Sequence, residues 1–301
     1  MKNLAEKINK LKEARRAIIL AHNYQLPEVQ DIADFVGDSL ALAQKVMKVK
    51  EEIIVVCGVK FMAETVKILN PDKKVLLPDK TAGCPMAEMI DVQKVRQLKN
   101  RYPDATVVCY VNSTVEVKAE SDICCTSSNA QKVINSLKDY QQIIFIPDKQ
   151  LGHFVSLSSD KEFIFCDGYC PVHNKITERN IKNLKKQFPR AEVLVHPECS
   201  LAARNSADKI LSTGWMQKYV SNSSTKDFII GTDSGIIHQI KKQNPEKNFY
   251  PANKQAICED MKKISLEKIA DVLENLNGEV EVNGKVGLKA KRGVEKMLKV
   301  G

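Results

Sequence analysis

Long hydrophobic runs are missing from this chain of 301 residues. Runs such as 53–57 are far too short to cross a bilayer, which takes about 20 apolar residues. The opening segment, residues 1–16, is charged and helix-like and holds no apolar stretch of the signal-peptide type. We therefore expect a protein without a membrane partner, located in the cytoplasm, where thiols stay reduced.

Aromatic residues and basic blocks are also scarce. Aromatics make up 6% of the chain, and although the formal net charge is +9, the lysines are scattered in ones and twos. Nucleic-acid-binding proteins instead concentrate basic residues on one face or carry a recognisable motif. We expect no nucleic-acid partner, and we interpret the charge as a solvated surface whose field can attract small anionic substrates.

Cysteine, in contrast, is abundant, and three of the nine cysteines belong to a repeated pattern. Each copy starts with a polar residue that ends an apolar run: His22, Tyr110 and His196. A hydroxyl residue follows at one interval (39 − 22 = 127 − 110 = 213 − 196 = 17): Ser39, Ser127 and Thr213. A cysteine follows at 84 − 22 = 62, 170 − 110 = 60 and 258 − 196 = 62: Cys84, Cys170 and Cys258. A period of about 87 residues suits a small domain rather than a solenoid unit.

The repeat predicts three domains: residues 1–103, 104–190, and 191–301 with a C-terminal tail. Each copy is expected to run strand, helix, strand, helix, strand, cysteine, helix. In the first copy the apolar pattern predicts strands at 17–21, 53–57 and 74–77, and helices at 29–36 and 61–69.

Strands that alternate with helices predict right-handed crossovers and a parallel sheet covered on both faces. The expected fold is therefore α/β, with three Rossmann-like α/β/α domains related by pseudo-threefold symmetry around a central metal site. The glycine fingerprint of dinucleotide-binding domains is absent from the sequence.

This fold predicts where the repeated residues gather. Ligands bind beyond the carboxyl ends of the strands in open α/β sheets, and His22, Tyr110 and His196 stand at such ends. Ser39, Ser127 and Thr213 each precede a helical pattern, so we predict that they cap helices, whose N-termini favour carboxylate or phosphate.

The three in-register cysteines each lie in a loop before a helix, where the helix N-terminus lowers the pKa of a thiol. Three thiolates without an in-register fourth indicate either zinc, completed by His173 or water, or a 4Fe–4S cluster with one open iron. Spacing alone leaves both open. We expect the other cysteines in the core, with Cys199 undecided between the core and the surroundings of the site: Cys57, Cys109, Cys124, Cys125 and Cys166.

Several short motifs resemble the quinolinate synthase family. They are ILAHNYQ at 19–25, GDS at 37–39, FMAE at 61–64, YVNS at 110–113, CPVH at 170–173, HPEC at 196–199 and STG at 212–214. The resemblance extends from about residue 18 to residue 263. It implies three α/β domains that enclose one 4Fe–4S cluster, held by Cys84, Cys170 and Cys258, with the open iron acting as a Lewis acid.

The resemblance also implies an activity of the transferase type. Iminoaspartate (iminosuccinate) would condense with dihydroxyacetone phosphate to quinolinate, releasing phosphate and water, as a step of NAD biosynthesis; an aspartate oxidase or dehydrogenase would supply iminoaspartate. It implies catalytic roles for Tyr24, Glu198, His22 and His196. It implies substrate contacts for His22, Ser39, Tyr110, Asn112, Ser127, His173, His196, Glu198 and Thr213.

Two other functions use the same residues. A zinc-dependent hydrolase or lyase would bind its metal through the same cysteines and would contain zinc without sulfide. A non-catalytic protein that binds a phosphorylated metabolite would keep the hydroxyls but would need neither Glu198 nor Tyr24.

Overall fold

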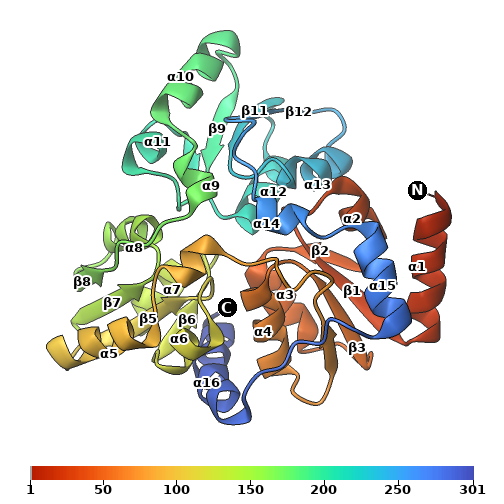
Figure 1. Ribbon diagram of the computed structural model, residues 1–301. Coiled ribbons are helices and arrows are strands. Elements are labelled where there is room, and N and C mark those ends of the chain that lie inside the picture. The colour runs from red at the N-terminus through yellow and green to blue at the C-terminus, as the bar shows by residue number, and fades with distance from the viewer. Residues whose placement is uncertain (1) are drawn as a thin grey trace.

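The computed structural model describes residues 2–301 and contains three parallel sheets of four strands each, arranged around the middle of the molecule (Figure 1). The first sheet has the order β2-β1-β3-β4, from β1 (Ala17–His22), β2 (Phe35–Gly37), β3 (Ile53–Cys57) and β4 (Lys74–Leu76). The second has the order β6-β5-β7-β8, from β5 (Thr106–Tyr110), β6 (Ile123–Cys125), β7 (Gln142–Ile146) and β8 (Glu162–Phe165). The third has the order β10-β9-β11-β12, from β9 (Glu192–Val195), β10 (Lys209–Ile210), β11 (Asp227–Gly231) and β12 (Asn248–Pro251).

Helices alternate with the strands in each of the three domains. Before the second sheet lie α1 (Lys2–Ala14), α2 (Pro27–Ile32), α3 (Ser39–Val46), α4 (Lys60–Leu69), the 3₁₀ turn η1 (Pro85–Glu88) and α5 (Val92–Arg101). Next come α6 (Val115–Ala119), α7 (Ala130–Ser136), α8 (Lys149–Ser156), α9 (Pro171–Asn174) and α10 (Glu178–Gln187). The remaining helices are α11 (Leu201–Asn205), α12 (Thr213–Asn222), α13 (Ile236–Gln243), α14 (Glu259–Lys262), α15 (Leu266–Asn275) and α16 (Gly284–Val300). The identical strand orders confirm the predicted α/β fold of three Rossmann-like domains.

The central strands form where the sequence has aliphatic runs. Every residue of β1 and β3 is buried, because helices cover both faces of the sheet and each strand must be apolar on both sides. Branched residues such as Ile54 and Val55 suit this pleated, covered surface. Helices stop before proline: α4 gives way at Asn70-Pro71 and α5 at Tyr102-Pro103.

The prediction of three strands per copy was wrong, because each sheet has a fourth, short edge strand. The helix expected over 29–36 ends at Ile32, and β2 pairs in parallel with β1 through Phe35, Val36 and Gly37. A strand of three residues is too short to display its own period, so Val36 matched the helical spacing of the residues before it.

The chain closes the ring of domains with α15. This helix begins as far after its cysteine as α5 and α10 do (266 − 258 = 92 − 84 = 178 − 170 = 8), so it stands where a fourth copy would start. It packs against α1, beside the first sheet. The final helix, α16, packs against α4, α6 and β6, between the first two sheets (Figure 1).

The C-terminal tail thus packs between the first and second domains, although it follows the third domain in sequence. The boundaries at 103 and 190 stay predictions, and Met1, included in the first predicted domain, lies outside the described residues. Within residues 2–301, no helix combines the length and the apolar character needed to traverse a bilayer.

Candidate active site

The three domains enclose one cavity of about 250 Å³. It is lined by every residue for which the sequence predicted a role: His22, Tyr24, Ser39, Cys84, Tyr110, Asn112, Ser127, Cys170, His173, His196, Glu198, Thr213 and Cys258. They lie at the ends of strands, in the loops that follow, or in the first turns of the next helices, as expected for a crevice beyond the carboxyl ends of parallel strands.

Two of the site loops orient a histidine in the same way. The backbone N–H of Tyr24 donates to Nδ1 of His22 (3.2 Å), and the N–H of Glu198 donates to Nδ1 of His196 (3.3 Å). Because Nδ1 accepts, a neutral ring carries its proton on Nε2. Burial lowers the pKa of both imidazoles to about 3. Both rings are therefore neutral at neutral pH, and each can donate from Nε2 toward a bound anion.

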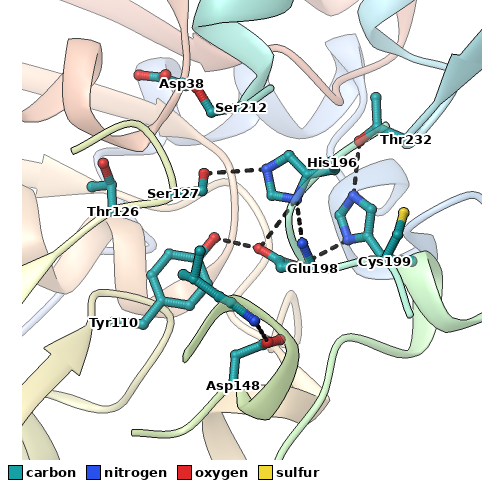
Figure 2. A network of polar contacts seen from close by, with 12 residues as sticks. Asp38, Tyr110, Thr126, Ser127, Asp148, His196, Glu198, Cys199, Ser212 and Thr232 are labelled. Carbon is teal, nitrogen blue, oxygen red and sulfur yellow. Dashed lines mark hydrogen bonds and ion pairs between the residues drawn. The ribbon is translucent and has the colours of Figure 1, made fainter. Parts of the chain in front are cut away.

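Glu198 is the centre of a buried polar network (Figure 2). One carboxylate oxygen lies 2.8 Å from Nδ1 of His173, and the other accepts a short hydrogen bond from the hydroxyl of Tyr110 and lies 3.7 Å from Nδ1 of His196. Burial acts to raise the pKa of Glu198, but His173, which contacts the carboxylate, and the Tyr110 hydroxyl outweigh it and hold that pKa below its usual range. Glu198 is thus an ionised carboxylate in the resting site.

Tyr24 and His173 share a hydrogen-bonding partner, Thr232. The Thr232 hydroxyl lies 2.5 Å from the Tyr24 hydroxyl and 2.8 Å from Nε2 of His173. Burial, together with the charge of Glu198, raises the pKa of Tyr24 well above its ordinary value. Tyr24 is therefore a protonated phenol that can donate a proton but does not give it up in the resting site.

The three repeated hydroxyls reach the cavity, but they do not cap helices as predicted. Asp38 caps α3 through the N–H of Ala41, and Ser212 caps α12 through the N–H of Trp215. Ser39 and Thr213 are instead the first residues of those helices. Because the preceding residue caps each helix, the hydroxyl of Ser39 remains available to a ligand. The hydroxyl of Thr213 accepts from Nδ2 of Asn23 (3.2 Å) and still has its own proton to donate.

Ser127 departs further from the prediction, since it lies in the turn before α7, and Asn129 precedes that helix without a side-chain cap. Its hydroxyl contacts Nε2 of His196 at 3.1 Å (Figure 2). Asn112 also lines the cavity, and its Oδ1 is buried without a partner within the described residues. A buried acceptor of this kind costs free energy unless a ligand or water satisfies it.

The three in-register cysteines are free thiols on the wall of this cavity. The expected lowering of their pKa by helix N-termini does not occur in this structure. Burial raises the pKa of Cys84 to about 12 and of Cys258 to about 11, and raises that of Cys170 well above its usual value; backbone N–H groups only partly oppose this. Buried neutral thiols are readily deprotonated by a metal that binds them.

The positions of the sulfur atoms bear on which metal fits. Among residues 2–301, the trio does not form a set of ligand atoms that all lie within 4.8 Å of one another. Two thiolates on one zinc ion stand at most about 4.6 Å apart, twice the usual Zn–S distance. In this structure the three thiols by themselves therefore do not meet the spacing of ligands on a single zinc ion.

A different set could hold one metal ion. Ligand atoms of Cys170, His173 and Glu198 all lie within 4.8 Å of one another. The structure thus contains a possible metal site that includes one of the three in-register cysteines.

The remaining cysteines are buried, as predicted. Cys57, Cys109, Cys124 and Cys125 lie inside strands, while Cys166 follows β8 by one residue instead of lying within a strand. Cys199, which the sequence left undecided, is fully buried in the core of the third domain, and its thiol contacts the carbonyl oxygen of Gly231 at 3.5 Å.

A close backbone contact places the loop of Cys170. A Cβ on Gly168 would lie 2.4 Å from the carbonyl oxygen of Pro147, a distance that real Cβ atoms do not adopt. We expect Gly168→Ala to lower the free energy of unfolding by about 1–3 kcal/mol, because the backbone must move to relieve the overlap. Denaturant unfolding measures this, and Gly284→Ala is the control, since a Cβ there meets nothing within 4 Å. Equal stability of the two variants would contradict the expectation.

The sequence patterns assigned no site role to Phe61, Asp38 or Thr232. Phe61 and Asp38 both line the cavity. Thr232 directly follows β11, and its place at a strand end was the available signal. Thr232 follows the third strand of its copy in sequence, whereas the repeated residues His22, Tyr110 and His196 stand at the first strand of each copy, so the repeat does not point to Thr232.

Comparisons with known proteins agree with the motifs. A family model described as "Quinolinate synthetase A protein" matches residues 6–299. "Quinolinate synthase" of Dehalococcoides mccartyi (strain CBDB1) is 52% identical over 297 residues, which cover 99% of this chain and 98% of the relative. "Quinolinate synthase 2" of Methanosarcina acetivorans is 50% identical, with 99% and 96% covered, and "Quinolinate synthase" of Clostridioides difficile (strain 630) is 48% identical, with 99% and 98% covered. With the family matched across nearly the whole chain and the site residues gathered in one cavity, this protein belongs to the quinolinate synthetase A family.

Proposed function

We propose that this enzyme condenses iminoaspartate with dihydroxyacetone phosphate to give quinolinate, phosphate and water, a transferase-type step of NAD biosynthesis. The observation that carries the proposal is the composition of the cavity. Three thiols from three domains share it with a histidine–tyrosine–glutamate network and with hydroxyls from two helix starts. One cavity thus offers ligands for a metal group, donors for anions, and acids and bases.

Cys84, Cys170 and Cys258 would hold a 4Fe–4S cluster. One thiol from each domain reaches the same cavity, and all three thiols are free, which supports this assignment. When bound, such a cluster would supply a Lewis acid at the iron that has no protein ligand.

The neutral donors of the cavity would bind the two anionic substrates. Hydroxyls of Ser39, Ser127 and Thr213, with Nε2 of His22 and His196, can donate to carboxylate and phosphate oxygens without adding fixed charge. The Asn112 side chain would complete its own hydrogen bonding by contacting the substrate.

Glu198 would act as the general base and Tyr24 as a proton donor. The carboxylate is ionised in the resting site and the phenol is protonated, so each begins in the state that its role requires. Tyr110 and His173 hold the carboxylate from two sides and fix its direction. Isomerisation and dehydration need positioned acids and bases, and in this proposal the network supplies them.

The proposed partners are small molecules. Iminoaspartate would come from an aspartate oxidase or dehydrogenase in the cytoplasm, and the excess of basic residues would favour the approach of both anionic substrates. We propose no nucleic-acid or membrane partner.

Product formation tests the proposal directly. Protein purified without oxygen, given dihydroxyacetone phosphate and iminoaspartate generated in situ, is expected to form quinolinate, detected by chromatography and mass spectrometry. Iron and acid-labile sulfide are measured on the same preparation. A fully cluster-loaded preparation that makes no quinolinate would refute the activity.

One observation favours a second candidate function. A single ion at Cys170, His173 and Glu198 would suit a zinc-dependent hydrolase or lyase. The same metal analysis separates the two, because this alternative requires zinc without sulfide.

A further inference from the structure

Three buried hydrogen-bond donors occupy one position of the repeat outside the proposed catalytic set. They stand eight residues after His22, Tyr110 and His196 (30 − 22 = 118 − 110 = 204 − 196 = 8): Gln30, Lys118 and Arg204. Each belongs to the short helix behind its site loop, α2, α6 or α11, and each is at most 3% exposed. Lys118 is fully buried, and an ammonium in that position is costly unless its contacts compensate.

Gln30 and Lys118 make equivalent contacts. Nε2 of Gln30 donates to the carbonyl of Gln25 (2.7 Å) in its own site loop, and Nζ of Lys118 donates to the carbonyl of Ser113 (2.7 Å) in its own. Gln25 and Ser113 both stand three residues after the start of their copies (25 − 22 = 113 − 110 = 3). Each donor therefore fixes the far end of the loop that carries the site residues.

The same atoms also reach the neighbouring domain. Gln30 donates to the carbonyl of Gly235 in the third domain (2.9 Å), and Lys118 donates to the carbonyl of Phe61 in the first (3.5 Å). Gly235 and Phe61 are themselves 235 − 61 = 174 residues apart, the offset that separates His22 from His196. The two contacts are thus one interdomain contact made twice by the pseudo-threefold arrangement.

Arg204 makes the third contact by another route. Its Nη2 lies 3.1 Å from Nδ1 of His153, on α8 of the second domain. The first domain thus contacts the third, the second contacts the first, and the third contacts the second. The three contacts follow the ring of domains in one direction.

We propose that Gln30, Lys118 and Arg204 are positioning residues that hold each site loop against the preceding domain, and that Lys118 sets the position of Asn112. Ser113, which Lys118 holds, directly follows Asn112, and its hydroxyl donates to the carbonyl of Tyr110 (2.9 Å). Phe61, the other end of the contact, lines the cavity, and the ammonium lies 5.3 Å from the centre of its ring. Lys118 touches no part of the cavity itself and acts only through its neighbours.

The inference rests on the proposed function for its kinetic test. Lys118→Met keeps most of the side-chain length and removes the charge and the donors. We expect kcat/KM to fall about 10- to 100-fold, the scale of effect of a small misplacement of site groups, with iron and sulfide content retained. Lys247→Met is the matched control. Lys247 is also buried, donates to the carbonyls of Val220 and Ser223, and lies 5.9 Å from the centre of the Phe228 ring, away from the cavity.

A double-mutant cycle distinguishes positioning from general loss of stability. If Lys118 acts through Asn112, Lys118→Met should cost less than about threefold in an Asn112→Ala background, because interacting sites are non-additive. Multiplicative effects, or a Lys118→Met enzyme with unchanged kcat/KM, would overturn the proposal. A loss of kcat/KM in Lys247→Met equal to that in Lys118→Met would overturn it too.

A second variant and a second measurement keep the test decisive. If Lys118→Met does not fold, a double-mutant cycle of the same design pairs Gln30→Leu with Tyr24→Phe, because Gln30 holds the loop that carries Tyr24. Amide hydrogen exchange needs no turnover, and segment 110–113 should exchange faster in Lys118→Met but not in Lys247→Met. An inactive wild-type protein would refute the proposed function, but the exchange result would still test the positioning role. Unchanged exchange of segment 110–113 in Lys118→Met would refute the positioning role.

Discussion

Replacing Cys84, Cys170 or Cys258 with Ser is expected to strip or destabilise the proposed cluster and abolish quinolinate formation. Among residues 2–301, each is the only cysteine that its domain brings to the cavity. A cluster that loses one of three protein ligands finds no replacement there, because the other cysteines of residues 2–301 are buried in the core. Iron and sulfide per chain, measured on protein prepared without oxygen, report the loss.

Core cysteines provide the control for this experiment. Cys57→Ala and Cys166→Ala remove buried volume, and Cys109→Ala also removes a weak hydrogen bond from its thiol to the carbonyl of Tyr110 (3.3 Å). Each should lower the free energy of unfolding by about 1 kcal/mol and leave the iron content intact. A core variant that loses iron, or an in-register variant that keeps it, would contradict the assignment of the three ligands.

Glu198→Gln is expected to lower the turnover rate by about two to four orders of magnitude, the usual contribution of a general acid or base. The amide keeps the shape of the side chain but cannot take up a proton, and it loses the charge that His173 and Tyr110 surround. Cluster content should be unchanged, so steady-state rates and iron analysis are measured together.

A second glutamate–tyrosine pair offers a matched control. Glu192 accepts a hydrogen bond from the hydroxyl of Tyr219 in the third domain, and neither residue lines the cavity. Glu192→Gln should keep the wild-type rate. An unchanged rate in Glu198→Gln would mean that Glu198 only contacts the substrate or supports the site.

The pKa of Glu198 also links the site to stability. Because its folded pKa lies below the ordinary value, the carboxylate stabilises the fold above that ordinary pKa, and this contribution is lost as the pH falls toward the folded pKa. Acid should therefore weaken the network around His173 and Tyr110, whereas the neutral range leaves it ionised.

The sequence by itself determined the repeat and the residues that its three copies share. Intervals along the chain are a local property, and each copy builds a similar strand and loop from similar residues. Intervals of 62, 60 and 62 residues therefore placed Cys84, Cys170 and Cys258 in one cavity. Aliphatic runs likewise located β1 and β3, since a strand covered on both faces must be apolar throughout.

Other features depended on neighbours that the sequence does not specify. The strand β2 forms by pairing with the free edge of β1. Ser39 does not cap α3 because the side chain of Asp38 already accepts the hydrogen bond from the N–H of Ala41. The helix α15 packs on α1, far from it in sequence, to close the ring.

The chemistry of the site was decided by burial and by contacts between domains. Burial raised the pKa of the cysteine thiols, where helix N-termini alone predicted the opposite. Thr232 belongs to the site because it contacts Tyr24 and His173. The ammonium of Lys118 hydrogen-bonds to carbonyl groups of two domains, a contact that no sequence interval predicts. Desolvation and long-range hydrogen bonds depend on what surrounds an atom in three dimensions, so only the tertiary structure could determine them.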